Sequence, residues 1–245
     1  PLFDKLNKLD TLKFFINKAK AAESNLHDIF YKGKITSIET KNNLFECLVR
    51  SVLFYCAPIW GLTSLEKIVS FQNNFIRRVL HLPRTVPSWL LRLESNITPI
   101  EFSFVKDTIK FWFRLVKKPD SSLVKQCYRG LMKVASDKNF KGNWYNDFYN
   151  LLKNSGVETA GLIDPVSEED VGILYEEVNK CISKLKESLN EKDIVKTQAS
   201  SKNVLYNNIK THIKTDSHFQ SNLSWENIRL YTQLRTNCGQ ITVNR

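Results

Sequence analysis

The sequence predicts an all-α fold, a multi-helix bundle with a three-helix N-terminal part followed by further packed helices. Apolar residues recur at helical spacing along most of the 245 residues, and 42% of all residues are hydrophobic, which is enough to supply a core. Gly and Pro, with 8 and 7 copies, are scarce for this length. That scarcity argues against a turn-rich β fold.

The first three helices are expected at residues 11–31, 38–56 and 64–81. Gly33 is a typical helix-ending residue for the first, and Ser37 or Thr36 is placed to cap the second. The second helix is apolar on most of its faces, which is typical of a buried helix. Thr63 and Glu66 form a capping box at the start of the third.

The third helix has the clearest amphipathic pattern in the sequence. Its apolar residues fall on one face at 100° per residue, while Arg77 and Arg78 fall on the other. Gln72 lies in the middle of the apolar face. Because a buried amide without hydrogen bonds is costly, Gln72 is expected to have partners.

Further helices are expected at residues 88–95, 99–117, 121–136, 143–154, 168–189, 198–214 and 224–236. Thr98, Pro99 and Glu101 supply a cap, a first-turn proline and a capping-box acid. Residues 154–165 are the best candidate for a linker. We therefore place a domain boundary there, between a basic helical extension at 83–155 and a C-terminal helical region with an acidic segment at 156–245.

The positive charge is concentrated in one part of the chain. The net charge is +11; residues 61–140 hold 14 Lys and Arg against 6 Asp and Glu, a net +8, whereas residues 141–200 hold 7 against 11, a net −4. This distribution indicates a basic surface with a separate acidic appendage.

The sequence does not support a membrane-spanning protein or a small protein stabilised by disulfides. The longest apolar stretch, 51–62, is about half the roughly 20 residues that a membrane-spanning helix needs, and charges interrupt the first residues, unlike a signal peptide. The five cysteines are scattered and form no C-x-x-C pair. We expect an intracellular protein of cytoplasm or nucleus, with cysteines acting as small apolar residues in helices, and a chain that is part of something longer.

Motifs for catalysis, phosphate-binding loops and metal sites are absent from the sequence. The acids at 168–170 and 176–177 lie on one expected surface helix and do not converge from separate elements, as metal chemistry requires. His212, His218 and Cys238 are too loosely spaced for a zinc site. We expect no catalytic residue, no metal and no cofactor in this chain.

A row of cations is the most informative feature. Lys106, Lys110 and Arg114 follow at i, i+4 and i+8, and Lys117 joins the same face. Such like-charge pairs cost a helix roughly 0.2–0.5 kcal/mol each, so the row indicates contact with an extended anion such as a phosphate backbone. The alternative is a solvated basic face. The predicted nucleic-acid-binding residues are Arg77, Arg78, Arg84, Lys106, Lys110, Arg114 and Lys117.

Aromatic residues near these cations could stack on bases. Trp60, Trp89, Phe111 and Trp112 are the candidates. Phe111 and Trp112 lie on the apolar side of their expected helix, so we assign them to the core. Trp89, beside Pro87 in a connecting segment, is the best remaining candidate.

Residues 44–112 carry an ordered set of short motifs. They include Leu53-Phe-Tyr55-Cys-Ala-Pro-Ile-Trp60-Gly61, Gln72-Asn-Asn-Phe75-Ile-Arg77-Arg78, Leu80-His-Leu82-Pro83-Arg84-Thr85, Pro99-Ile100 and Phe111-Trp112. In order and spacing this set resembles the segment that follows the catalytic domain in reverse transcriptases of non-LTR (LINE-like) retrotransposons.

The resemblance implies that residues 1–82 form the thumb, which grips the template–primer duplex behind the polymerase active site. The family's catalytic aspartates would lie upstream of Pro1, so no catalytic residue carries over to this chain. The implied function is a non-catalytic, nucleic-acid-binding portion of an RNA-directed DNA polymerase, with an RNA or DNA duplex and the upstream polymerase chain as partners. The alternative is a helical scaffold, or a host-adapted retroelement remnant, that binds an acidic protein partner.

Overall fold

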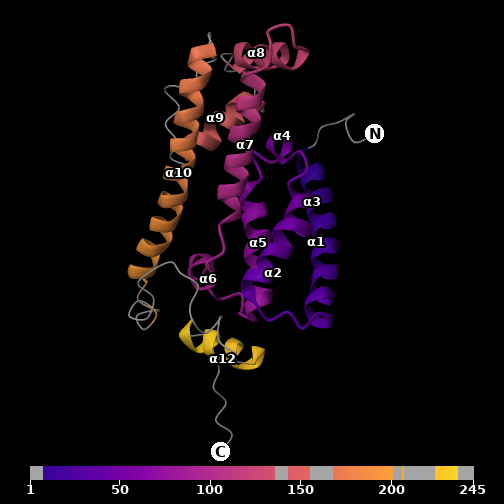
Figure 1. Cartoon of the computed structure of the whole chain (residues 1–245), viewed down its shortest axis with the longest axis vertical. Helices are drawn as coiled ribbons and strands as arrows, with labels where there is room; N and C mark the ends of the chain where they lie inside the picture. Colours follow the sequence, from indigo (N-terminus) through magenta and orange to yellow (C-terminus); the bar gives the residue numbers. More distant parts are fainter. Residues whose placement is uncertain (1–7, 136–142, 155–167, 201–205, 207–223, 237–245) are drawn as a thin grey trace, which may run out of the picture. The chain divides into compact units, whose positions relative to one another are not determined.

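The structure is a computed structural model, and it describes residues 8–135, 143–154, 168–200, 206 and 224–236. Every regular element among these residues is helical (Figure 1). In chain order the elements are α1 (Lys8–Lys32), α2 (Ile38–Leu44), the π-helical η1 (Phe45–Arg50), α3 (Ser51–Leu53), α4 (Ala57–Trp60), α5 (Leu65–Leu80), α6 (Ser88–Ser95), α7 (Ile100–Val116), α8 (Leu123–Ala135), α9 (Trp144–Asn154), α10 (Glu168–Gln198) and α12 (Trp225–Arg235). The predicted all-α class is confirmed.

The helices fall into two compact units. Unit 1 holds the described residues of Pro1–Leu12, Cys56–Leu65 and Glu101–Ser188, and unit 2 holds those of Lys13–Tyr55, Glu66–Ile100 and Leu189–Arg245. The units interleave along the chain, because α1, α7 and α10 each have residues in both. This division differs from the three consecutive segments expected at 1–82, 83–155 and 156–245, which rested on local composition.

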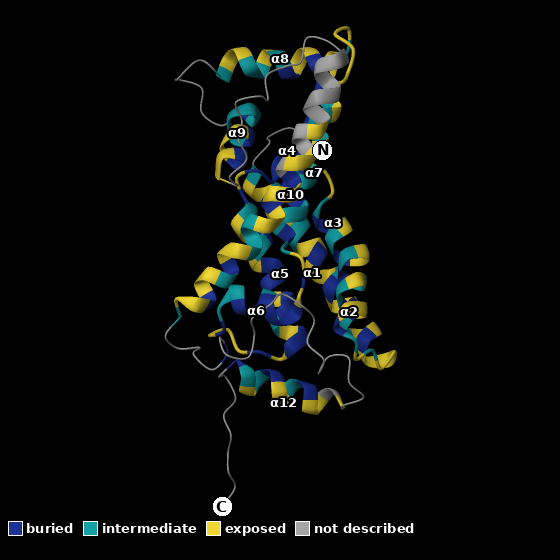
Figure 2. Ribbon diagram, turned by 60° about the vertical axis from the view of Figure 1, so that its left-hand side comes forward, coloured by how far each residue is buried: buried dark blue, intermediate teal, exposed yellow. Residues whose placement is uncertain are grey.

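Unit 2 is built on a three-helix bundle of α1, the continuous run α2–η1–α3, and α5. Figures 1 and 2 both show these helices side by side, and Figure 2 shows α5 largely buried. The ring of Phe45 on η1 lies 4.2 Å from that of Phe75 and 6.2 Å from that of Phe71, both on α5. The apolar face of α5 is therefore its packing face, and the expected three-helix part is confirmed.

Gln72 has the hydrogen bonds that its buried position required. Its amide nitrogen donates to the carbonyl oxygen of Thr98 at 3.1 Å, and its amide oxygen accepts from the backbone N–H of Ile100 at 2.8 Å. Gln72 is 1% exposed. One side chain of α5 thus holds the connection between α6 and the start of α7.

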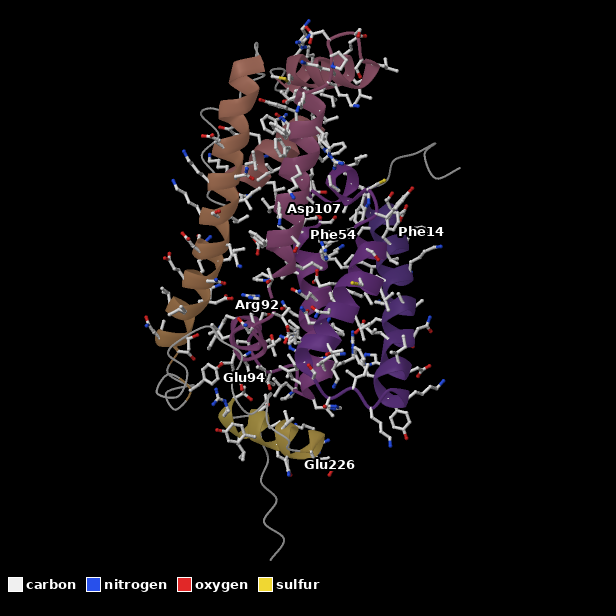
Figure 3. The ribbon with its side chains drawn as sticks, viewed as in Figure 1. Phe14, Phe54, Arg92, Glu94, Asp107 and Glu226 are labelled. Atoms are coloured by element: carbon white, nitrogen blue, oxygen red, sulfur yellow. The ribbon has the colours of Figure 1, made fainter. Side chains whose placement is uncertain are left out.

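Helix α6 joins segments of unit 2 that are far apart in sequence. Arg92 donates from Nε and Nη2 to the two carboxylate oxygens of Asp193 on α10, at 2.6 and 2.5 Å. Glu94, fully buried, accepts from Arg235 of α12 at 3.0 Å and from the hydroxyl of Tyr206 at 2.8 Å. Figure 3 labels Arg92 and Glu94 on α6.

Unit 1 has an aromatic core. Trp144 stacks on Phe148 with ring centroids 5.2 Å apart and planes 8° apart, and the ring of Trp112 lies 5.7 Å from that of Phe148. The indole N–H of Trp112 donates to the hydroxyl of Tyr128 at 2.9 Å. The indole N–H of Trp144 donates to the carbonyl oxygen of Pro58 at 2.8 Å, which fixes α4 against α9.

Most helix limits agree with the expectations within a few residues, and the exceptions have local causes. The helix expected at 38–56 ends at Leu53 and passes through the π-helical η1. It is also less buried than its apolar composition indicated, because Leu48 and Tyr55 are 45% and 66% exposed. Helix α1 ends at Lys32, directly before Gly33 as expected, and Lys34 has a positive φ of 49°. Ser37 caps α2 as expected, accepting from the N–H of Thr40 at 3.2 Å.

The structure tests only part of the predictions for the helices and linker after residue 154. Helix α10 runs on to Gln198 instead of ending near residue 189. The linker expected at 154–165 and most of the helix expected at 198–214 lie outside the described residues. No helix within the described ranges is both long and apolar enough to cross a bilayer.

The cysteines agree only in part with the expectation of small apolar residues in helices, because Cys47 and Cys127 lie in helices and Cys56 does not. Cys47, Cys56 and Cys127 are all exposed and carry free thiols. Cys56 is not helical, because it adopts the left-handed conformation, with φ of 53°, just before α4. The side chain of Cys181 and the whole of Cys238 lie outside the described part.

Candidate nucleic-acid interface

Helix α7 of unit 1 presents the predicted row of cations on a rigid support. Its opposite face is buried through Phe104, Val105, Ile109, Trp112 and Val116, each at most 2% exposed. The hydrogen bond from Trp112 to Tyr128 and the stack on Phe148 fix the rotation of the helix about its axis. The spacing of i, i+4 and i+8 then directs the cations away from this core.

We call Lys106, Lys110, Arg114 and Lys117 the α7 stripe. Lys110, Arg114 and Lys117 are exposed, and Lys106 is half-buried with its ammonium 5.8 Å from the ring of Phe102. Arg114 makes a long contact of 3.4 Å from its Nε to the carbonyl oxygen of Lys110. Within the described ranges, no carboxylate lies at ion-pair distance from any of the four. The stripe can therefore accept an external anion without breaking an internal ion pair.

Helix α8 repeats the same spacing with Lys125, Arg129 and Lys133, a row that the sequence analysis did not select. Lys125 and Arg129 each lie 3.0 Å from the carboxylate of Asp120. Their hydrogen bonds lower the pKa of Asp120. Two of the three cations thus already form ion pairs with a carboxylate of the same unit. Exposed Lys133, and exposed Lys118 beside the stripe, are the cations that extend the basic surface of unit 1.

The predicted arginines of unit 2 have different environments. Arg78 is bound to the buried carboxylate of Glu23 on α1, with its Nε 2.9 Å from Oε1. Arg77 donates to the carbonyl oxygen of Val86 at 2.9 Å, and burial followed by the charge of Arg84 lowers its pKa. Arg84 is exposed and has no ion pair among the described residues. Arg77 and Arg78 therefore also bind groups within unit 2, whereas Arg84 makes no ion pair among the described residues. Arg78 is itself exposed, and phosphate contact by the three arginines stays a prediction.

The aromatic candidates are mostly core residues. Trp112 is 1% exposed, as expected, and Trp60 is 4% exposed and cannot stack on a base without unfolding. Phe111 is half-buried, with its ring 6.0 Å from that of Trp144. Trp89 is half-buried at the start of α6, where its predicted stacking role remains a prediction.

The structure describes only part of the acidic and metal-binding candidates. In the part of the chain that the structure describes, no three His, Cys, Asp or Glu side chains form a group that could hold a metal ion. Glu176 on α10 is exposed, and the side chains of residues 168–170 are not described. His212, His218 and Cys238 also lie outside the described residues.

Comparisons of the chain with protein-family models, with curated proteins and with solved structures give no significant match.

Proposed function

We propose that this chain binds the phosphate backbone of a nucleic-acid duplex, as the non-catalytic, template–primer-gripping portion of an RNA-directed DNA polymerase of a non-LTR retrotransposon. The observation that carries the proposal is the α7 stripe. Three of its four cations are exposed, and none has a carboxylate partner among the described residues. Backbone contacts by Lys and Arg supply affinity without reading base sequence.

Two further features support the polymerase setting. Residues 44–112 resemble the segment that follows the catalytic domain in such reverse transcriptases, and the bundle of α1, α2–η1–α3 and α5 has the three helices that a thumb requires. In this proposal the duplex is held by α7, and catalysis takes place on another part of the parent polymerase.

The test is duplex binding by the full chain, measured by fluorescence anisotropy over a range of salt concentrations. The triple variant Lys110→Glu, Arg114→Glu, Lys117→Glu should bind a labelled RNA–DNA duplex at least about tenfold more weakly at low salt. Its slope of log K against log salt should be shallower by about 2–3, at roughly 0.7–0.9 per lost phosphate contact.

A matched control separates local contact from overall charge. Lys180, Lys184 and Lys186 of α10 are exposed and belong to the same unit. Reversing these three changes the net charge by the same amount but should leave most of the affinity and the salt slope in place. If both triple variants lose affinity equally, the α7 stripe is not the binding site. If the unmodified chain binds no duplex at low salt, the proposed function is wrong.

A second candidate, a helical scaffold for an acidic protein partner, is favoured by one observation on α8. Leu123 and Val124 at the start of α8 and Val134 near its end are 74%, 51% and 38% exposed, and they belong to the same unit as the basic stripe. Protein interfaces commonly place such apolar residues beside charges. A defined protein partner that stays bound after nuclease treatment, and that duplex does not displace, would favour this candidate.

A further inference from the structure

Aromatic rings of unit 2 are exposed on the surface that α1 and the end of α3 share. Tyr55, two residues after α3, is 66% exposed, and Phe14 of α1 is 38% exposed. The ring of Phe15 joins them, 5.3 Å from that of Phe14 and 5.9 Å from that of Tyr55. Figures 1 and 2 show α1 and α3 side by side, and Figure 3 labels Phe14 on α1. We call these three residues, together with Lys18, the α1–α3 patch.

A lysine ammonium lies on this aromatic surface. Nζ of Lys18 lies 5.1 Å from the centroid of the Phe14 ring, which is a cation–π distance. Lys18 is exposed and lies one turn after Phe14 on α1. The contact holds the ammonium beside the exposed rings without neutralising its charge. The α1–α3 patch therefore combines an exposed ring surface with a positive charge, and all four of its residues belong to unit 2.

The surrounding part of α1 is basic. Residues 11–22 contain three exposed lysines and no Asp or Glu. These lysines are Lys13, Lys18 and Lys20. Asp10 is exposed one turn before Phe14, so an anion is expected on the opposite side of that ring, toward the C-terminal end of α1. On the neighbouring run α2–η1–α3, the carboxylate of Glu46 is bound to Arg50. The local charge thus favours a negatively charged partner.

We propose that the α1–α3 patch binds single-stranded nucleic acid. One base would stack on the ring of Tyr55, and Lys18 would contact a phosphate of the same strand. A duplex does not fit this role, because its bases are already stacked and paired. A protein partner fits less well, because protein interfaces are depleted in lysine. The patch lies in unit 2, so this function goes beyond duplex binding by the α7 stripe of unit 1.

The probe is a labelled oligothymidylate of about 12 nucleotides, a length that such single-strand sites cover. Its binding to the full chain is measured by fluorescence anisotropy over a range of salt concentrations. Tyr55→Ala should weaken binding by about tenfold, the effect of losing one stacked base, and should leave the slope of log K against log salt unchanged. Lys18→Gln should instead make that slope shallower by about 0.7, the value for one phosphate contact on a single strand. Equal affinities of Tyr55→Ala and the unmodified chain would overturn the proposal.

Two further variants test whether the patch itself is responsible. Tyr31→Ala removes a tyrosine that is 87% exposed on the same helix, at the other end of α1, and should change the affinity less than about twofold. Tyr55→Trp keeps a stacking ring and should keep the affinity of the unmodified chain. Circular dichroism establishes that all the variants are folded. A loss in Tyr31→Ala as large as that in Tyr55→Ala, or a loss of the same size in Tyr55→Trp, would contradict the site.

Duplex binding separates this proposal from the proposed function. Tyr55→Ala should change the affinity for the RNA–DNA duplex less than about twofold, and its effect on the single strand should persist in the triple reversal on α7. Either proposal can therefore fail while the other holds. Sedimentation of the chain without nucleic acid tests a different occupant. If Tyr55→Ala changes the oligomeric state but not the affinity for the strand, the patch is an interface between copies of this chain and the proposal is wrong.

Discussion

The carboxylate of Glu94 lies 3.0 Å from Nε of Arg235, although the two residues are 141 positions apart in the sequence. Glu94 is fully buried, and the side chain of Arg235 is only 8% exposed. The hydroxyl of Tyr206 donates to the second carboxylate oxygen at 2.8 Å. A buried ion pair of this kind holds the last described helix of unit 2 against α6.

Removing one partner of this pair should be more harmful than removing both. Arg235→Met leaves a buried carboxylate without its counter-ion and should lower the free energy of unfolding by about 3–5 kcal/mol in urea denaturation. The double variant Glu94→Gln, Arg235→Met should recover a large part of that loss. The control variant Arg84→Gln, at an exposed residue, should change the free energy of unfolding by less than about 0.5 kcal/mol. A double variant no more stable than the single one would show that charge is not the main factor.

Gln72→Leu tests the connection between α5 and the start of α7. The leucine leaves the buried N–H of Ile100 and the carbonyl oxygen of Thr98 without their partner, at about 1–3 kcal/mol for each group. We expect a loss of about 2–4 kcal/mol in the free energy of unfolding. Gln126→Leu removes only an exposed contact of 3.4 Å and is the matched control. Equal stabilities of the two variants would contradict the role of Gln72.

Replacing Gly61 and Gly130 by alanine should change the stability of the protein in opposite directions. A Cβ at Gly61 would lie 2.8 Å from Cε2 of Phe104 and 2.9 Å from the carbonyl oxygen of Ala57, so Gly61→Ala should cost about 1–3 kcal/mol. A Cβ at Gly130, within α8, meets nothing within 4 Å. Gly130→Ala should therefore stabilise the protein by about 0.5–1 kcal/mol, through the higher helix propensity of alanine. Thermal unfolding measures both; a neutral Gly61→Ala would refute the close packing.

Lys41 should make stability depend on pH in the alkaline range. Burial lowers its pKa to about 8 from an ordinary value of 10.5. Between these values the unfolded chain holds the proton and the folded chain does not, so this group makes stability rise with pH across that window. Below pH 8 the amine is charged in both states, and its desolvation cost is fully present.

Lys41→Met should accordingly be more stable than the unmodified protein at pH 7, by up to about 3 kcal/mol for a shift of this size. The difference should shrink as the pH is raised toward 10. Urea denaturation of both proteins at several pH values measures it. A difference that is the same at pH 7 and pH 10 would show that the Lys41 amine titrates as it does in the unfolded chain.

The helical class and most helix positions follow from local patterns in the sequence. Helical spacing of apolar residues and local caps such as Ser37 act within a few residues, so they can be read without knowing the fold. The need of Gln72 for partners was also visible from its place on an apolar face. The sequence did not show which groups would be those partners, because Thr98 and Ile100 lie 26 and 28 residues away from Gln72.

Which cations already have an ion-pair partner depends on the tertiary structure. Arg78 and Lys110 both stand on the polar faces of their helices, and the sequence placed them in one predicted site. Folding brings Glu23, 55 residues away, onto Arg78, but brings no described carboxylate onto Lys110. Exposure and ion pairing depend on distant partners, so the spacing of residues along one helix cannot specify them.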